Sequence, residues 1–335
     1  MKAFEIQKFG LESLAMAERP MPKPAAGQAL VKMRAVSLNF RDLMMVKGHY
    51  NPKLKMPLVP LSDGVGEVVE VGPGAKRVKV GDRVCGIFMQ RWLAGGVSDE
   101  VADSALGGAI NGVAAEYVLF DEDGLVQVPK HLTDEEAATL PCAAVTAWNA
   151  VMVSGRVKAG DTVLLQGTGG VSLFALQFAK LHNARVIITS SSDDKLERAK
   201  KLGADELINY KTTPDWEEKA RGLTHKTGVD HIVEVGGAGT LAKSLRAVCA
   251  GGHIALIGVL TGGGEVNPIP ILMKSVRVQG IYVGSREMFE AMNRAIEQSQ
   301  LRPVVDKVFR FEELPQALKY METGAHFGKI VVKIS

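Results

Sequence analysis

The chain is short of cysteine, of long apolar runs and of clustered charge, and each shortage excludes a class of protein. The three cysteines, Cys85, Cys142 and Cys249, are widely spaced and odd in number, which argues against a disulfide framework. No stretch approaches the roughly 18 apolar residues of a membrane span, and the N-terminal MKAFEIQKFG lacks the apolar core of a signal peptide. We therefore expect a cytoplasmic protein that makes no use of a membrane.

Charge is nearly balanced, with 40 basic and 37 acidic residues and a formal net charge of +3. The basic residues are spread along the chain, whereas nucleic-acid binding usually needs a basic patch or stripe. We expect a small-molecule substrate as the partner, and no nucleic acid. The length of 335 residues is enough for two domains of ordinary size.

The N-terminal third predicts β-structure, because Val-rich runs such as QALVKMRAVSL, GVGEVVEVG and GDRVCGIF are punctuated by Gly and Pro. The segment from Trp92 to Gly112 lacks periodicity and predicts a long loop. At TDEEAATLPCAAVTAW the pattern changes. Thr133 and Glu136 have the spacing of a capping box and predict the start of a helix.

From Asp161 onward, Val- and Ile-rich strands alternate with helical patterns, one of which is TLAKSLRAVCAGG. This alternation predicts a parallel sheet covered by helices on both faces, an α/β fold. A further helix, REMFEAMNRAIEQ, and a last strand, GKIVVKIS, complete the chain.

A glycine-rich turn follows the first of these strands in DTVLLQGTGGVSLFALQFAK. The run contains Gly167, Gly169 and Gly170. Gly167 would permit the tight turn, Gly169 would let the backbone approach a pyrophosphate, and the helix N-terminus would supply N–H donors. Ser172 stands at the third fingerprint position, where Gly or Ala is usual, and a small residue there still allows close helix–strand packing. The strand–turn–helix context predicts a dinucleotide site.

The end of the next strand indicates which dinucleotide binds. An NAD site usually presents an acidic residue there, but this chain has Ser190 in ITSSSDDKLERAK. A hydroxyl and the nearby ammonium of Lys195 suit a 2′-phosphate, so the sequence favours NADP(H). We expect Asp193 and Asp194 to cap the following helix.

Over its whole length the chain resembles the medium-chain dehydrogenase/reductase superfamily, and most of all its zinc-free quinone oxidoreductase and alcohol-dehydrogenase-like branch. The resemblance rests on AVSLNFRDLMMVKGHY, PLVPLSDGVGEVVEVGPGAKRVKVGDRV, LPCAAVTAW, QGTGGVS, KLGADELINY and FGKIVVKI, in the family's order. It implies a GroES-like β-barrel catalytic domain over residues 1–124, completed by 281–335, and a Rossmann doubly wound domain over 125–280. It also implies a homodimer that pairs edge strands around residues 265–282.

The chain departs from this pattern at the zinc ligands. Zinc alcohol dehydrogenases carry Cys where this chain has Asn39, and Gly-His-Glu where it has Leu61-Ser62-Asp63, and only Cys142 matches a ligand. An amide and a hydroxyl bind zinc poorly. Residues 86–141 contain no Cys, so the structural zinc lobe is absent too. We expect no zinc, with Cys142 a small apolar residue.

The resemblance also assigns cofactor contacts. Besides Gly167, Gly169, Gly170, Val171, Ser190 and Lys195, it implies contacts from Thr146, Tyr210, Val235, Gly236, Gly258, Val259, Tyr282 and Lys329. Each of these has an ordinary structural alternative; Tyr210, for example, could be a half-buried core residue, and Val259 could be packing in the sheet.

Without zinc, charge developing on a substrate oxygen needs hydrogen-bond donors instead. Asn39 can donate a hydrogen bond, and Tyr50 can also donate a proton, so we expect these two residues to be catalytic. Arg41 and Asp42, between them in the sequence, are predicted to form a structural ion pair.

Three functions stay open on the sequence. The first is an NADPH-dependent, zinc-independent oxidoreductase that transfers hydride to quinones, enones or activated carbonyls. The second is an alcohol dehydrogenase, with a non-standard metal site at Cys142 as one form of it. The third is a dinucleotide binder with little turnover.

Overall fold

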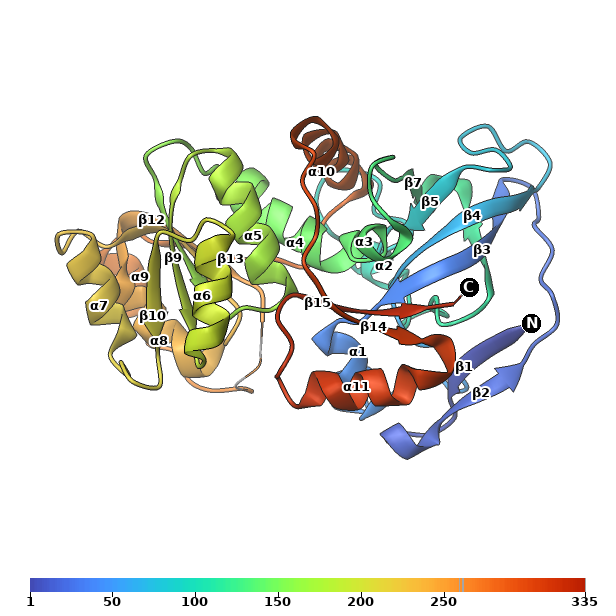
Figure 1. Cartoon of the computed structure of the whole chain (residues 1–335), viewed down its shortest axis with the longest axis horizontal. Helices are drawn as coiled ribbons and strands as arrows, with labels where there is room; N and C mark the ends of the chain where they lie inside the picture. Colours follow the sequence, from blue (N-terminus) through green and yellow to red (C-terminus); the bar gives the residue numbers. More distant parts are fainter. Residues whose placement is uncertain (259, 261, 335) are drawn as a thin grey trace. The chain divides into compact units, whose positions relative to one another are not determined.

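The computed structural model describes residues 1–258, 260 and 262–334, which form two compact units (Figure 1). One unit contains residues 1–145 and 284–335, and the other contains residues 146–283. Both ends of the chain therefore belong to the first unit. The domain boundaries expected from the resemblance, at residues 124, 125, 280 and 281, stay a prediction.

The second unit is built on a six-stranded parallel sheet in the order β10-β9-β8-β11-β12-β13. Its strands are β8 (Thr162–Gln166), β9 (Arg185–Ser190), β10 (Glu206–Asn209), β11 (Val229–Glu234), β12 (Val248–Leu256) and β13 (Arg277–Gly280). The order reverses between β8 and β11, as in the Rossmann fold, and the expected α/β fold with a doubly wound parallel sheet is confirmed.

Helices cover both faces of this sheet, with α5 and α6 on one face and α7 and α8 on the other (Figure 1). The helices of the unit are α4 (Val145–Trp148), α5 (Gly170–Leu181), α6 (Asp193–Lys201), α7 (Trp216–Leu223), α8 (Ala238–Ala247) and α9 (Ile269–Met273). The helix predicted over TLAKSLRAVCAGG ends earlier than expected, at Ala247. Val248 already pairs with Val229 of β11, and Gly251 has φ +73°, a conformation outside a right-handed helix.

The first unit contains a seven-stranded sheet in the order β14-β15-β3-β4-β5-β7, with β6 paired to β3. Its strands are β3 (Gln28–Ser37), β4 (Asp63–Val71), β5 (Arg83–Gly86), β6 (Tyr117–Asp121), β7 (Leu125–Gln127), β14 (Val305–Arg310) and β15 (Lys329–Lys333). A hairpin of β1 (Lys2–Ile6) and β2 (Leu14–Glu18) adds a second, two-stranded sheet. Because β15 pairs antiparallel with β3, residues from both ends of the chain meet in one sheet.

Helices of one to four turns accompany this sheet. They are α1 (Phe40–Val46), α2 (Asp99–Ala102), α3 (Asp134–Ala137), α10 (Arg286–Ser299) and α11 (Leu314–Glu322). The segment 92–112, expected to be only loop, contains the one-turn helix α2, which Ser98 caps by accepting a hydrogen bond from the Val101 N–H. The Ala-rich stretch after α3 continues as π-helical turns over Leu140–Ala144 and Asn149–Ser154, on either side of α4.

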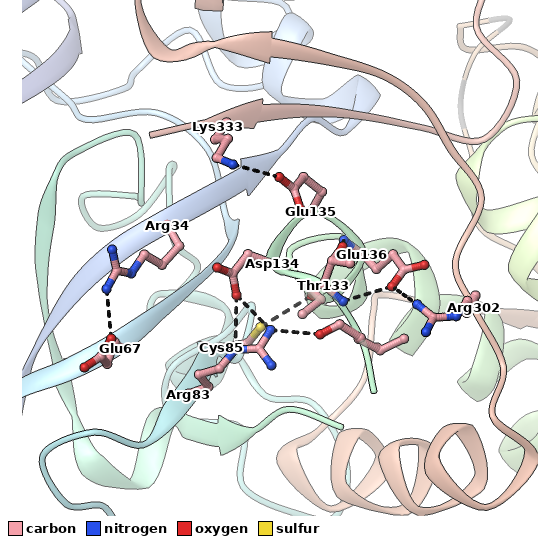
Figure 2. A network of polar contacts seen from close by, with 12 residues as sticks. Arg34, Glu67, Arg83, Cys85, Thr133, Asp134, Glu135, Glu136, Arg302 and Lys333 are labelled. Carbon is pink, nitrogen blue, oxygen red and sulfur yellow. Dashed lines mark hydrogen bonds and ion pairs between the residues drawn. The ribbon is translucent and has the colours of Figure 1, made fainter. Parts of the chain in front are cut away.

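The predicted capping box at α3 is confirmed, and ion pairs surround it (Figure 2). The Thr133 N–H donates to Glu136 Oε2 (2.9 Å), and the Glu136 N–H donates to Thr133 Oγ1 (3.2 Å). Arg302 also donates to Glu136 (2.7 Å), while Lys333 pairs with Glu135 (3.4 Å). Residues from the C-terminal part of the chain thus hold α3 in place.

Among the described residues, every helix is too short or too polar to span a bilayer.

Candidate functional site

The glycine turn between β8 and α5 has the geometry expected of a phosphate site. Gly167 has φ +73°, and Gly169 directly precedes the first turn of α5, in which Val171 lies. A Cβ atom added at Gly167 or Gly169 would have no neighbouring heavy atom within 4 Å, so space is open beside the backbone. The first N–H groups of a helix have no partner inside it, which suits an anion. The turn fits the pyrophosphate of a dinucleotide.

Ser172 behaves as the small residue that the fingerprint requires. Its side chain is buried, and its hydroxyl donates to the Gln166 carbonyl at the end of β8 (2.6 Å). The helix therefore packs closely on the strand although the usual Gly or Ala is missing.

Three residues predicted to bind the 2′-phosphate lie around the ends of β9 and β10. Ser190 is the last residue of β9, and its carbonyl accepts the N–H of Tyr210 (3.0 Å), which directly follows β10. Lys195 lies in the first turn of α6. Ser190 is buried, whereas the Tyr210 side chain is exposed, so the alternative of Tyr210 as a half-buried core residue does not hold.

The predicted cap of α6 was wrong. Ser192 caps the helix, because its hydroxyl accepts the N–H of Lys195 (3.4 Å) and its backbone is still extended. Asp193 instead accepts a hydrogen bond from the Asn209 side chain (2.8 Å). Both Asp193 and Asp194 lie inside the first turn, where a carboxylate is favoured by the helix dipole.

A buried carboxylate, Glu234, orders the loop after β11, and no sequence pattern had indicated it. One oxygen accepts the N–H groups of Gly236 (2.8 Å) and Gly237 (3.1 Å) and the hydroxyl of Thr240 (2.5 Å). The other accepts the amide of Gln166 (2.7 Å) and the hydroxyl of Ser244. Five donors thus fix the start of the loop that contains the predicted cofactor residues Val235 and Gly236.

The remaining predicted cofactor residues of this unit lie on neighbouring segments. A Cβ atom added at Gly258 would lie 1.9 Å from the Val235 carbonyl oxygen, so only glycine fits where the two loops approach. Tyr282 follows β13, and Thr146 is buried in α4. Val259 lies outside the described residues.

In the first unit, Asn39 and Asp42 form the start of α1. Asn39 is the N-cap residue, and its backbone N–H donates to Asp42 Oδ2 (2.8 Å). Both side chains are buried. Asn39 Oδ1 accepts a hydrogen bond from the Lys329 ammonium of β15 (2.6 Å), which also donates to the Leu38 carbonyl (2.6 Å).

Ser62 and Asp63 approach the same region from the start of β4. The preceding Leu61 has φ +71°, a strained conformation for a branched side chain, and the Val113 N–H holds its carbonyl (3.0 Å). The Ser62 hydroxyl donates to Asp63 Oδ1 (2.7 Å), and the backbone N–H of Cys142 donates to Asp63 Oδ2 (3.0 Å). Asn39, Ser62 and Cys142, which stand at the positions of zinc ligands in the relatives, therefore lie around Asp63. Two of them carry an amide and a hydroxyl in place of metal-binding groups.

The electrostatics of this cluster follow from burial. Burial raises the pKa of Asp42 to about 6, against the opposing effect of Arg41. Burial also raises the pKa of Asp63, although Lys329 and the Ser62 hydroxyl oppose it. Desolvation and the nearby Asp63 raise the pKa of the Cys142 thiol, so that it keeps its proton at neutral pH.

Tyr50 lies beside Arg41. The guanidinium carbon of Arg41 lies 5.5 Å from the centroid of the Tyr50 ring and 4.6 Å from that of Phe88. The predicted ion pair is present, since Arg41 Nη1 lies 3.8 Å from Asp42 Oδ1. The Tyr50 side chain is 40% exposed. Arg41 thus connects the phenol to the buried carboxylate of α1.

A catalytic zinc does not suit these residues. Asn39 offers an amide and Ser62 a hydroxyl, which are poor zinc ligands, and an ammonium already contacts Asn39 Oδ1. Within the described part of the chain, no three His, Cys, Asp or Glu side chains gather in a way that could hold a metal ion.

Comparison with known proteins supports both domains. The model of the alcohol dehydrogenase GroES-like domain matches residues 25–130, and the zinc-binding dehydrogenase model matches residues 170–298. A zinc-type alcohol dehydrogenase-like protein of Schizosaccharomyces pombe is 45% identical over 97% of this chain and 96% of its own length. The chain belongs to the medium-chain dehydrogenase/reductase superfamily.

This superfamily member is also similar to a solved structure. A putative alcohol dehydrogenase from Sinorhizobium meliloti superposes with a TM-score of 0.93 at 43% identity, covering 99% of this chain and 98% of that one. The GroES-like and Rossmann architecture is thereby confirmed, and the protein is a nicotinamide-dependent oxidoreductase of the alcohol-dehydrogenase-like type.

The relatives differ in how well they support the expected substrates. The quinone oxidoreductase of Rattus norvegicus is only 26% identical, over 99% of this chain and 97% of its own. The more similar relatives carry alcohol dehydrogenase names. The comparisons therefore favour the alcohol dehydrogenase alternative over reduction of quinones or enones.

Proposed function

We propose that the protein is an NADP(H)-linked alcohol dehydrogenase that interconverts an alcohol and an activated carbonyl compound without catalytic zinc. The observation that carries this proposal is the contact of 2.6 Å between the Lys329 ammonium and Asn39 Oδ1, at a position where zinc relatives hold a cysteine. An amide stands there in place of a metal ligand, and it is already paired with an ammonium. A zinc ion at this position would be repelled by the positive charge of the ammonium.

The chain supplies the binding groups for the cofactor. Gly167, Gly169 and the first turn of α5 would hold the pyrophosphate. Ser190, Lys195 and Tyr210 would hold the 2′-phosphate, and the absence of a carboxylate at the end of β9 supports NADP(H) over NAD(H). When bound, the nicotinamide supplies or accepts the hydride.

Asn39 and Tyr50 would then replace the metal in the reduction direction. Asn39 donates a hydrogen bond to the substrate oxygen and stabilises the charge that develops as hydride reaches the carbonyl carbon. The Tyr50 phenol donates the proton that completes the alcohol, and it regains a proton from solvent, to which its side chain is exposed.

A second candidate is the reduction of enones or quinones. It is favoured because the site offers hydrogen-bond donors, the Asn39 amide and the Tyr50 phenol, in place of a metal ion. A conjugated or electron-poor acceptor needs less polarisation than a simple ketone, so two hydrogen-bond donors are enough. The same residues would serve, with hydride delivered to the β-carbon of an enone or to a quinone.

One experiment separates these possibilities. The purified full-length protein is assayed with NADPH and NADH against aldehydes, ketones, enones and quinones, and with NADP⁺ against alcohols, with its metal content measured in parallel. We expect turnover with a carbonyl–alcohol pair, a preference for NADPH, and activity that survives chelation. About one zinc per chain, with activity lost on chelation, contradicts the zinc-free mechanism. Turnover of enones and quinones alone supports the second candidate.

For the assembly, we propose a homodimer formed through the edge of the Rossmann sheet. Among the described strands, β13 pairs only with β12, and the adjacent helix α9 exposes Ile269, Leu272 and Met273. Unpaired strand edges and exposed apolar side chains favour association with a second copy.

A further inference from the structure

Lys329 is an unusual residue for the start of a strand, because its long charged side chain is almost entirely buried. Its exposed fraction is 3%, and its ammonium donates to two acceptors, the Leu38 carbonyl and Asn39 Oδ1, each at 2.6 Å. Buried lysines need such partners, since an uncompensated ammonium is strongly disfavoured away from water. Both acceptors belong to the two residues that directly precede α1.

The chemistry of this contact decides how the Asn39 amide is turned. An ammonium has only donors, and the amide has one acceptor, its oxygen. Oδ1 must therefore face Lys329, and Nδ2 must face the opposite way. Nδ2 is buried without a close hydrogen-bond partner, and the amide lies on the side of Asp63, where its N–H groups oppose the rise of that carboxyl's pKa.

From this geometry we infer that Lys329 is a positioning residue that fixes the Asn39 amide with Nδ2 available as the donor to a substrate oxygen. This inference rests on the proposed function, in which Asn39 contacts that oxygen. An unpaired buried donor is rare in folded proteins, and a ligand oxygen would satisfy it. The lysine also supplies positive charge beside Asp42 and Asp63, where a metal-dependent relative would have its ion.

As a positioning residue, Lys329 would have a different role from the cofactor contact that the family resemblance implied. A cofactor contact would act mainly on the affinity for NADPH. A positioning residue acts through Asn39, so its loss should change kcat and leave cofactor affinity nearly unchanged. A third possibility, a purely structural lysine, would affect stability alone.

The test uses the full chain with the variants Lys329→Met, Asn39→Ala and the double variant, and Lys333→Met as the matched control. Lys333 lies on the same strand, but its partly exposed side chain pairs with Glu135. We measure kcat, KM and the dissociation constant for NADPH. We expect each single site variant to lower kcat by at least about tenfold, with the NADPH dissociation constant within about threefold and the Lys333→Met variant unchanged.

The double variant decides whether the two residues act as one unit. We expect it to be no slower than Asn39→Ala, because Lys329 then has no amide to position. Multiplied losses overturn the inference, as does weaker NADPH binding with unchanged kcat. Lys329→Arg should recover part of kcat, since arginine is also only a donor.

A further variant keeps the test valid if Lys329→Met does not fold. Asn39→Asp retains an acceptor for Lys329 but replaces the Nδ2 donor with an oxygen. We expect a folded protein with kcat lowered as in Asn39→Ala, and full activity would overturn the inference.

If the wild type turns over no substrate, the proposed function fails by itself. Crystal structures of the wild type and Lys329→Met then decide the orientation. We expect the Asn39 side chain to take a different rotamer once the lysine is gone, because Oδ1 then loses the ammonium that holds it, and an unchanged Asn39 side chain would overturn the inference.

Discussion

Asp42 is a buried carboxyl whose ionisation should influence stability. Its pKa is about 6 in the folded chain, against an ordinary value of 3.8. Below about pH 4 the group is protonated in both states and has no effect. Between about pH 4 and 6 the unfolded chain releases its proton first, so folding loses stability as the pH rises. Above about pH 6 the loss is complete, at roughly 3 kcal/mol.

The Asp42→Asn variant tests this prediction, because an amide oxygen can still accept the Asn39 N–H. We expect urea unfolding between pH 4 and 7 to show a smaller loss of stability for the variant than for the wild type. Asp63, whose pKa is also raised by burial, should retain part of the slope. Parallel stability curves for the two proteins would refute the prediction.

Lys195 should determine the preference for NADPH. A charge-assisted hydrogen bond to a phosphate contributes about 1.5–3 kcal/mol, which corresponds to roughly ten- to a hundredfold in affinity. We expect Lys195→Ala to weaken NADPH binding by about this factor and to leave NADH binding nearly unchanged, as measured by fluorescence titration. Lys200→Ala, an exposed lysine on the same helix, serves as the control. Equal losses for both cofactors would show that Lys195 does not contact the 2′-phosphate.

Tyr50 should act as the proton donor. Removing its hydroxyl in Tyr50→Phe keeps the ring beside Arg41 but removes the acid. General-acid catalysis contributes about 10²–10⁴-fold, so we expect carbonyl reduction to slow at least tenfold, with less effect on quinones. Steady-state rates and NADPH affinity are compared with those of Tyr117→Phe, which loses a phenol elsewhere in the first unit. Unchanged rates for Tyr50→Phe would leave water or the cofactor ribose as the proton source.

At the scale of secondary-structure elements, Glu234 joins β8, β11 and α8. It accepts hydrogen bonds from Gln166, Thr240 and Ser244 as well as from the loop backbone. In Glu234→Gln an amide nitrogen would face the amide nitrogen of Gln166. We expect a loss of about 1–3 kcal/mol in the free energy of unfolding, and weaker binding of NADPH.

The reciprocal exchange provides the control for this prediction. In the double variant Gln166→Glu with Glu234→Gln, the donor and the acceptor change places and the pair is complementary again. We expect the double variant to recover much of the stability lost in Glu234→Gln, as measured by urea unfolding. If the double variant is less stable than either single variant, the contact between the two side chains is not what holds the loop.

At the scale of the whole molecule, the exposed apolar side chains of α9 should mark the interface between two copies. Leu272 is 77% exposed and Met273 is 76% exposed in the single chain. We expect the wild type to be a dimer by light scattering, and Leu272→Glu to shift it toward the monomer because a carboxylate is costly to bury. Val80→Glu, at an exposed apolar residue of the first unit, should leave the dimer intact. A monomeric wild type would contradict the proposed assembly.

The sequence by itself determined the features that depend on neighbours along the chain. Strand and helix periods predicted the parallel sheet, the glycine spacing predicted the turn at Gly167, and the Thr133–Glu136 spacing predicted the cap of α3. Helix α7 was missed, although Trp216 and Ala220 are buried four residues apart, because the segment is mostly polar. The C-terminal end of α8 and the N-cap of α6 also differ from the prediction. Several adjacent residues at each place could end or cap a helix, and the sequence pattern does not choose between them.

The tertiary structure alone decided which distant residues share a site. Lys329 donates a hydrogen bond to Asn39, 290 residues earlier in the sequence. Glu234 accepts one from Gln166, 68 residues earlier. Periodicity and spacing report only on contacts within one or two turns or strands, so they cannot pair a buried charge with its distant partner. The family resemblance brought positions 39, 62 and 142 together. Only the fold showed that an ammonium contacts Asn39 in that cluster, because burial requires every charged group there to find a compensating partner.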